Sequence, residues 1–304
     1  MTLFYWLIYV LVPLVFFIQL WRGKFTSRRA WTLYTVMAGL FIAYLFLVGR
    51  WDVVGYFPRI LIVVMFLTAA VRSFFKNRDL ARRGPRKSWK YRFNLITYTA
   101  LSLYFGAFVL LALWGMSDRE KPVHLHFPLQ DGVYHVVHGG STTAINYHHT
   151  HRAQAYALDM VKLNRAGMRA NHLSPESLRQ FVIYQDPLYS PCSGEVIQAV
   201  DGLKELEPFE MNRDTQSYRQ QHPTGNHVRI GCKGVEVVIA HLVPGSLQVE
   251  KGQRIEAGDP IGRVGNSGNT SEPHLHIHAE KNGQGVPIRF GGRFLIRNSL
   301  VFSR

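Results

Sequence analysis

The stretch that decides the fold of the second half of this chain is NSGNTSEPHLHIHAEKNG, residues 266–283. It places histidines at every second position: His274, His276 and His278. Side chains alternate between the two faces of a β-strand, so residues two apart point to the same side. The two apolar residues between the histidines are therefore expected to face a hydrophobic core. Neighbouring histidines on the opposite face can be directed at one metal ion or one reacting group.

Charge divides the 304-residue chain into two chemically different halves. Of the formal net charge of +15, residues 1–116 carry most, with 15 Lys and Arg against two acids, whereas residues 117–304 hold 20 Lys and Arg against 18 acids. All 14 histidines lie at His124 or later. A basic excess can indicate nucleic-acid binding, but here it is concentrated in the apolar half. We therefore expect no nucleic-acid partner.

The first half, residues 1–116, is predicted to be a membrane region with four transmembrane helices. The runs 2–20, 31–49 and 94–115 contain no charged residue. Each is long enough to cross an apolar layer of about 30 Å as a helix. A fourth run, 53–71, contains Arg59 near one end, where a long side chain can reach the interface. A re-entrant or interfacial segment is the alternative for this run.

The loops between these runs predict the orientation. The loops at 21–30 and 72–92 are strongly basic, and the loop RWD at 50–52 is almost neutral. Loops rich in Lys and Arg stay in the cytoplasm. The N-terminus and everything after residue 116 are then expected outside the cytoplasm, with the lipid bilayer and its anionic lipids as partners of the helices.

The second half is predicted to be mainly β, with antiparallel strands. A polar segment at 117–132 is interpreted as a linker, followed by a domain at 133–304 that has short β-branched runs and frequent glycines. The segment 174–182 has a Ser followed by Glu, which predicts one short helix. The polar segment 201–225 is predicted to be a loop.

The chain has two cysteines, Cys192 and Cys232. Each lies in or beside a predicted strand, in the half expected outside the cytoplasm, where disulfides persist. We predict a disulfide, which would contribute about 4 kcal/mol through loop closure. Two buried thiols are the alternative.

Residues able to bind a metal form three clusters along the second half. A hydrolytic zinc site needs three protein ligands and an open position for water. The clusters are INYHHTHRAQAYALDMV, with His148, His149 and His151 before Asp159; VVIAHLVPGS, with His241; and PHLHIH, with His274 and His276.

Together with SPCSGEV, GNHV and GDPIGRVGNSG, in this order, the clusters resemble the lysostaphin/LytM-type zinc metalloendopeptidases over roughly residues 130–288. The resemblance implies a β-sheet groove with one zinc ion, held by a His, an Asp and the second His of the His-x-His pair. Asp159 and His276 match two of these ligands. His241 and His274 match the family's two catalytic histidines that do not bind the metal.

The first ligand departs from the common family pattern, which places a His four residues before the Asp, where this chain has Ala155. A variant form has N-x-H, a longer spacer and then Q-x-Y-A-x-D. That form assigns His148 as the ligand, and His149 and His151 remain open. His278 is interpreted as a wall residue or a hydrogen-bond donor behind the metal ligands.

The resemblance implies hydrolysis of peptide bonds in peptidoglycan stem peptides or cross-bridges by zinc-activated water. His241 or His274 would accept the water proton or stabilise the oxyanion. Peptidoglycan lies outside the cytoplasmic membrane, so we expect a multi-pass protein of the bacterial inner membrane with its C-terminal domain outside. The alternative is a catalytically inactive relative that binds cell wall and activates another hydrolase.

Overall fold

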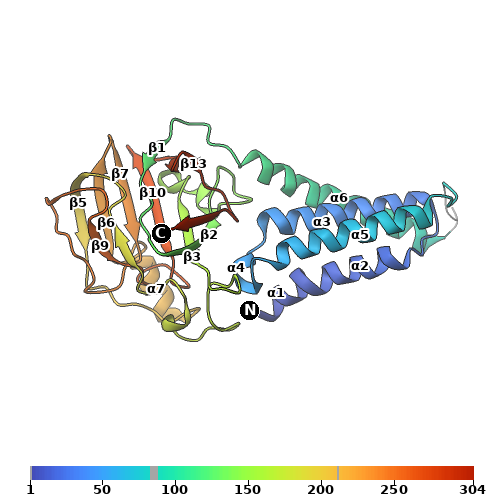
Figure 1. Ribbon diagram of the computed structural model, residues 1–304, viewed down its shortest axis with the longest axis horizontal. Coiled ribbons are helices and arrows are strands. Elements are labelled where there is room, and N and C mark those ends of the chain that lie inside the picture. Colours follow the sequence, from blue (N-terminus) through green and yellow to red (C-terminus); the bar gives the residue numbers. More distant parts are fainter. Residues whose placement is uncertain (1, 83–87, 211) are drawn as a thin grey trace. The chain divides into compact units, whose positions relative to one another are not determined.

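The computed structural model describes residues 2–82, 88–210 and 212–304. The chain forms two compact units, Met1–Leu113 and Trp114–Arg304. The predicted fold class is confirmed, because unit 1 consists of apolar helices and unit 2 is a mainly antiparallel β-domain (Figure 1).

The described residues of unit 1 include four helical segments that are long and apolar enough to cross a membrane, at Phe4–Arg22, Arg28–Val48, Pro58–Asn77 and Trp89–Trp114. They overlap the four predicted runs, but the run 53–71 begins in the separate helix α4 (Trp51–Val54), and the long helix starts at Pro58. Residues 83–87 of the basic loop 72–92 lie outside the described residues. The elements are α1 (Thr2–Trp6), η1 (Leu7–Leu11), α2 (Val12–Arg22), α3 (Arg28–Val48), α4 (Trp51–Val54), α5 (Pro58–Asn77) and α6 (Trp89–Trp114).

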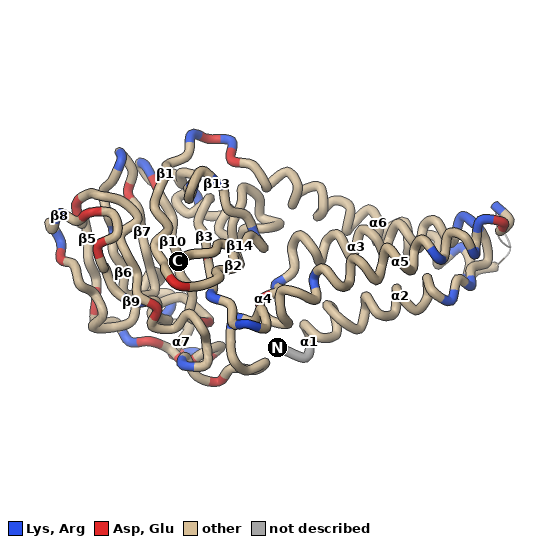
Figure 2. The backbone as a smooth tube through the Cα atoms, in the orientation of Figure 1, with Lys and Arg blue, Asp and Glu red and all other residues tan. Residues whose placement is uncertain are grey.

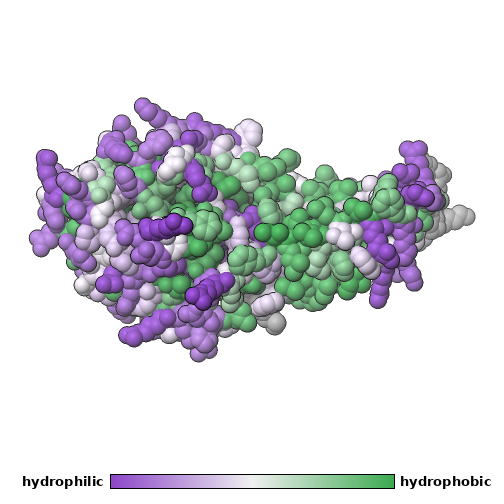
Figure 3. All heavy atoms as spheres, viewed as in Figure 1, coloured by the Kyte–Doolittle hydropathy of each residue, from purple (hydrophilic) through white to green (hydrophobic). Residues whose placement is uncertain are grey.

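The surface of these helices is apolar, which suggests insertion in a membrane. Large apolar side chains such as Leu61, Ile96 and Leu103 are exposed, and hydrophobic residues cover much of the helices' visible face (Figure 3). Arg59 is buried, its Nε donates to the Phe46 carbonyl at 2.8 Å, and its guanidinium lies over the Phe46 ring. The Arg59 charge thus interacts with a carbonyl and an aromatic ring inside the helical unit.

Unit 2 is built on a nine-stranded sheet with the order β14-β2-β3-β10-β7-β6-β5-β8, and β11 pairs with β10. Smaller sheets are formed by β1, β12 and β13 and by β4 and β9. The strands are β1 (Val123–Leu125), β2 (Gly132–His138), β3 (Leu158–Lys162), β4 (Pro187–Tyr189), β5 (Gly194–Val200), β6 (His227–Cys232), β7 (Val235–Ala240), β8 (Arg254–Ile255), β9 (Pro260–Arg263), β10 (Leu275–Lys281), β11 (Gln284–Val286), β12 (Ile288–Phe290), β13 (Arg293–Phe294) and β14 (Leu300–Ser303).

Strand β10 lies in the middle of this sheet, between β3 and β7. Leu275 and Ile277 are fully buried in the hydrophobic core, as the alternating sequence predicts. Burying their side chains stabilises the domain and fixes the register, because a one-residue slip would exchange the two faces. The sheet also carries the disulfide between Cys192 and Cys232.

Three segments differ from the sequence-based expectation. Residues 117–132 are more than a linker, because β1 pairs in parallel with β12 and Asp118 forms an ion pair with Arg289. Only a 3-10 turn, η4 (Leu178–Gln180), forms within 174–182, and the chain then extends to pair at Phe181. The predicted loop 201–225 contains helix α7 (Arg213–Gln221), which begins at an Asn212 capping box.

Candidate metal centre and catalytic groups

Asp159 and His276 are direct cross-strand partners on β3 and β10. The Nδ1 atom of His276 lies 2.8 Å from Asp159 Oδ1. Both residues are buried. Paired strands of one sheet therefore bring together two residues that are far apart in the sequence.

His148 completes this group from the other side of Asp159, with its Nε2 atom 2.8 Å from Asp159 Oδ2. It lies in the 3-10 turn η2 (Tyr147–Thr150), which Asn146 caps by accepting a hydrogen bond from the His148 backbone N–H. The Asn146 amide also donates to the Gly140 and Ala157 carbonyls. Asn146 thereby fixes the turn against the chain leading into β3.

The neighbouring histidines of this turn point elsewhere. The Nδ1 atom of His149 lies 3.0 Å from the Ala155 carbonyl oxygen, and His151 is exposed. The ring of His148 is buried, and its Nδ1 atom has no hydrogen-bond partner within the described residues. His148 is thus the histidine of this turn that faces Asp159.

The second ring nitrogen of His276 faces His278. His276 Nε2 and His278 Nδ1 are 3.0 Å apart, and both rings are buried. If Nδ1 of His276 binds a metal, its Nε2 must carry the proton and donate a hydrogen bond to Nδ1 of His278. A hydrogen bond of this kind orients a metal-binding imidazole and fixes its tautomer.

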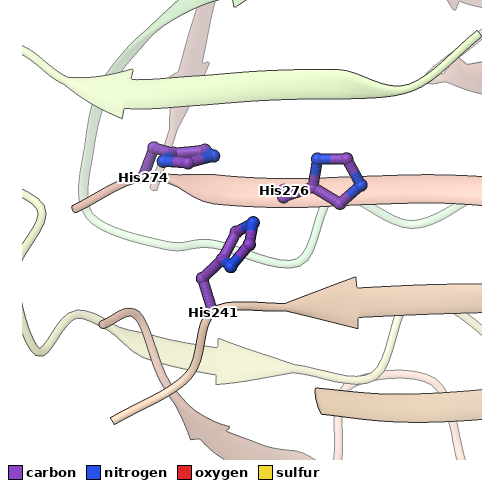
Figure 4. A group of neighbouring side chains, drawn as sticks. All are labelled: His241, His274 and His276. Carbon is purple, nitrogen blue, oxygen red and sulfur yellow. The ribbon is translucent and has the colours of Figure 1, made fainter. Parts of the chain in front are cut away.

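His241 and His274 lie beside this group, and each is held through its Nδ1 atom. His241 Nδ1 donates to the Ser267 carbonyl at 2.8 Å, and His274 Nδ1 donates to the Glu272 carbonyl at 2.8 Å. His241 follows β7 with a φ of 65°, a left-handed conformation that is uncommon for a non-glycine residue. Figure 4 shows its ring directed towards His274, just before β10, and His276 of β10.

The two rings are close to each other and to His276. Their centroids are 5.1 Å apart, and the His241 and His276 centroids are 5.6 Å apart. Because each Nδ1–H donates to a carbonyl oxygen, the lone pair of each neutral ring lies on Nε2. His274 Nε2 faces the Asp159 carboxylate at 3.5 Å. A neutral imidazole can accept a proton at Nε2, and an imidazolium can donate one.

The buried charges shift several pKa values. Burial raises the pKa of Asp159, but the neighbouring His148 and His274 outweigh burial and hold it well below its usual range. Burial lowers the pKa of His274, and Asp159 overcomes this to raise it. The pKa of His241 is well below its usual value because of burial and the nearby His274 and His276.

Among the described residues, two groups of side chains have the spacing to hold a metal ion, and they share His276. In each group the ligand atoms lie within 4.8 Å of one another; the groups are His148, Asp159 and His276, and His241, His274 and His276. Two imidazole nitrogens and one carboxylate oxygen are a donor set that suits zinc. In the first group, His148 Nε2 and His276 Nδ1 each lie 2.8 Å from an oxygen of Asp159. In the second group, His274 Nε2 lies 3.5 Å from that carboxylate. Zinc therefore fits the first group.

Other contacts at this site were not foreseen from the sequence. The Tyr147 ring packs on His148, with centroids 4.1 Å apart. Arg169 Nε donates to Glu272 at 2.6 Å, and both side chains are buried. The backbone carbonyl of Glu272 is the one that holds His274, so this ion pair supports the site from a loop 103 residues earlier in the sequence.

Comparison with known proteins gives a match to the model of peptidase family M23 over residues 181–288. Residues 181–288 are a peptidase family M23 domain. No curated protein matches the chain.

Solved structures similar to the chain include three peptidases. A zinc-containing peptidase from Vibrio cholerae is 17% identical over 54% of this chain and 39% of its own, with a TM-score of 0.32. Lysostaphin is 18% identical over 41% and 36%, with a TM-score of 0.25. A point mutant of the catalytic domain of the prophage-encoded M23 protein EnpA from Enterococcus faecalis is 19% identical over 43% and 72%, with a TM-score of 0.27. The chain thus covers less than two fifths of the length of the first two.

The M23 match includes some residues of the site and not others. His241, His274 and His276 lie within it, whereas His148 and Asp159 precede it. The assignment of His148 and Asp159 to the site therefore depends on the contacts of the Asp159 carboxylate. Asp159 contacts the second histidine of the matched His-x-His pair, and the His148 ring lies beside that histidine with centroids 4.8 Å apart.

Proposed function

We propose that this protein is a membrane-anchored zinc metalloendopeptidase that hydrolyses peptide bonds in peptidoglycan stem peptides or cross-bridges. The observation that carries the proposal is the position of Asp159 between His148 Nε2 and His276 Nδ1, each 2.8 Å from one of its oxygens. Next to this carboxylate are His241 and His274, whose Nδ1 atoms donate to backbone carbonyls, and His274 Nε2 lies 3.5 Å from Asp159. The M23 domain supports the peptidase class and the cell-wall substrate.

His148, Asp159 and His276 would hold the zinc ion. When bound, zinc lowers the pKa of a water molecule towards about 7 and polarises the scissile carbonyl. His278 would keep the proton of His276 on Nε2, leaving Nδ1 free to bind. His241 and His274 would accept the proton of the attacking water at Nε2, or donate from Nε2 to the oxygen of the scissile carbonyl as it becomes negative.

The function can be tested with the full-length protein in detergent and purified peptidoglycan as the substrate. We expect new amino groups to appear, their release to stop when a chelator removes zinc, and activity to return when zinc is added. Asp159→Asn is the matched inactive control, because it keeps the size of the side chain and removes its charge. A wild-type protein that binds zinc and releases no amine from peptidoglycan would instead be the non-catalytic relative.

We also propose a location in the bacterial inner membrane, with unit 2 outside the cytoplasm. The four apolar helices support insertion, and most Lys and Arg residues of unit 1 gather at the end where α2 and α5 finish and α3 begins (Figure 2). Basic ends of this kind stay in the cytoplasm. Protease added outside an intact inner membrane should digest unit 2, and protection of unit 2 would reverse the orientation.

A further inference from the structure

A cavity of ≈ 650 Å³ lies at the basic end of unit 1 and has no part in peptide hydrolysis. The described residues that line it are Arg28, Arg29, Thr32, Leu33, Arg82 and Thr99. These residues come from the beginning of α3, the segment after α5, and α6. We propose that this cavity binds the phosphate-bearing headgroup of an anionic phospholipid.

The charge of the cavity is positive and uncompensated. Within the described parts of unit 1, no carboxylate pairs with the three lining arginines. The only acids of residues 1–113 are Asp52 and Asp79, which form ion pairs with Arg50 and Arg78. Guanidinium groups bind phosphate oxygens with two parallel hydrogen bonds, so a cluster of them without an acid favours a phosphate ligand.

Backbone hydrogen bonds hold the walls of the cavity together without using the guanidinium groups of its arginines. The N–H groups of Arg28 and Arg29 donate to the carbonyls of Ala81 and Arg82, which ties the segment after α5 to the beginning of α3. The hydroxyls of Thr32 and Thr99 donate to carbonyls of their own helices. Among the described lining residues, the hydrogen-bond donors available to a phosphate are thus the three arginine side chains.

An apolar surface continues from the cavity along both helices, which favours a lipid over a soluble phosphate. Arg29, Leu33 and Val36 are three or four residues apart and therefore lie on one side of α3. Val36 is 46% exposed, and Leu103 of α6 is 71% exposed. The rings of Tyr34 and Tyr98 are in contact and hold the two helices side by side. A headgroup at the arginines would place its acyl chain along this apolar surface.

The test compares two triple variants of the full chain in nanodiscs of equal parts phosphatidylglycerol and phosphatidylcholine. The first variant is Arg28→Gln/Arg29→Gln/Arg82→Gln. The control is Arg22→Gln/Lys24→Gln/Lys90→Gln, at the end of α2 and the start of α6, which removes the same charge but none from the described lining of the cavity. Phosphatidylglycerol retained by the protein after release from the nanodisc is counted by native mass spectrometry.

Each basic residue near an anionic membrane accounts for roughly a fivefold change in binding. Both variants lose this general attraction equally. We expect the cavity variant to retain at least about tenfold less phosphatidylglycerol than the control, with phosphatidylcholine unchanged in both. Equal retention by the two variants would overturn the proposal, because it would mean that only the overall charge matters.

Inorganic phosphate distinguishes the lipid from a soluble ligand. The wild-type protein in a zwitterionic detergent, without lipid, is dialysed against radiolabelled phosphate. We expect no stoichiometric binding at millimolar concentration, because the apolar surface then has no partner. Stoichiometric binding that is lost in the cavity variant would assign the cavity to a free phosphate-bearing solute and overturn the assignment to a lipid.

Discussion

His276 on β10 and Asp159 on β3 lie directly opposite each other across the sheet, with 2.8 Å between His276 Nδ1 and Asp159 Oδ1. The pairing of these two strands brings a carboxylate and an imidazole to one point inside unit 2. His148 reaches the other oxygen of the same carboxylate. The carboxylate is therefore held between two imidazoles.

Removing a ligand should empty the metal site. His276→Ala and His148→Ala are expected to lose most of the bound zinc together with activity, because each removes one of three donors. His149→Ala is the matched control, since the His149 side chain faces the Ala155 carbonyl. Zinc per protein is measured by elemental analysis after gel filtration. Loss of zinc from His149→Ala with retention in His148→Ala would move the ligand to the neighbouring residue.

Removing His241 or His274 should separate catalysis from metal binding. Each alanine variant is expected to keep about one zinc and to lose roughly 10²–10⁴-fold in turnover, the usual contribution of one acid–base group. The measurement pairs zinc content with the rate of amine release from peptidoglycan. Loss of zinc from both variants would instead favour the all-histidine group of His241, His274 and His276 as the metal site.

His278 is predicted to position His276 without binding the metal. His278→Ala should weaken zinc affinity by roughly 10–100-fold, because the Nε2 proton of His276 loses its acceptor. His278→Asn should restore much of the affinity, since an amide oxygen can take the place of Nδ1, whereas His278→Leu should not. Competition with a zinc-binding dye gives the affinity. Equal effects of Asn and Leu would leave His278 with a packing role alone.

The ion pair at the start of unit 2 should contribute to stability in a pH-dependent way. Two hydrogen bonds from Arg289 hold the pKa of Asp118 below its usual value. A carboxylate with a lowered pKa stabilises the fold above its unfolded pKa of about 3.9, and the contribution is lost as the pH falls through the folded value. The melting temperatures of the wild type and Asp118→Asn should therefore differ at pH 7, and the difference should begin to shrink at roughly pH 4 and disappear once the pH is below the folded pKa of Asp118.

Arg289→Gln provides the check on this prediction. It removes the partner of Asp118 and should show the same pH dependence relative to the wild type. A difference between the wild type and Asp118→Asn that is constant from pH 7 to pH 3 would mean that the carboxylate contributes only through packing.

The alternation of β10 could be predicted because it is local. Apolar and histidine residues in turn specify the two faces of a strand, and Leu275 and Ile277 are buried as expected. The identity of the first ligand could not be predicted in the same way. Three histidines lie within four residues, and the hydrogen bonds of Asn146 to Gly140 and Ala157 set the position of the turn that carries them.

Other features depend on contacts that are distant in the sequence. The Arg169–Glu272 ion pair joins residues 103 positions apart and leaves no local pattern. Helix α7 is short and polar, so it lacks the apolar periodicity that identifies a helix, although its Asn212 and Thr215 capping pair was a local signal. The segment 117–132 looked like a linker because its strand β1 has only three residues.

The position of the metal tests the central claim most directly. Crystals of the full-length protein grown with zinc should give an anomalous difference peak, measured at the zinc absorption edge, between His148 Nε2, the Asp159 carboxylate and His276 Nδ1. One peak at that point, about 2.0–2.2 Å from each donor atom, is the predicted result. A peak among His241, His274 and His276 that does not touch Asp159, or no peak in a protein that cleaves peptidoglycan, would contradict the account.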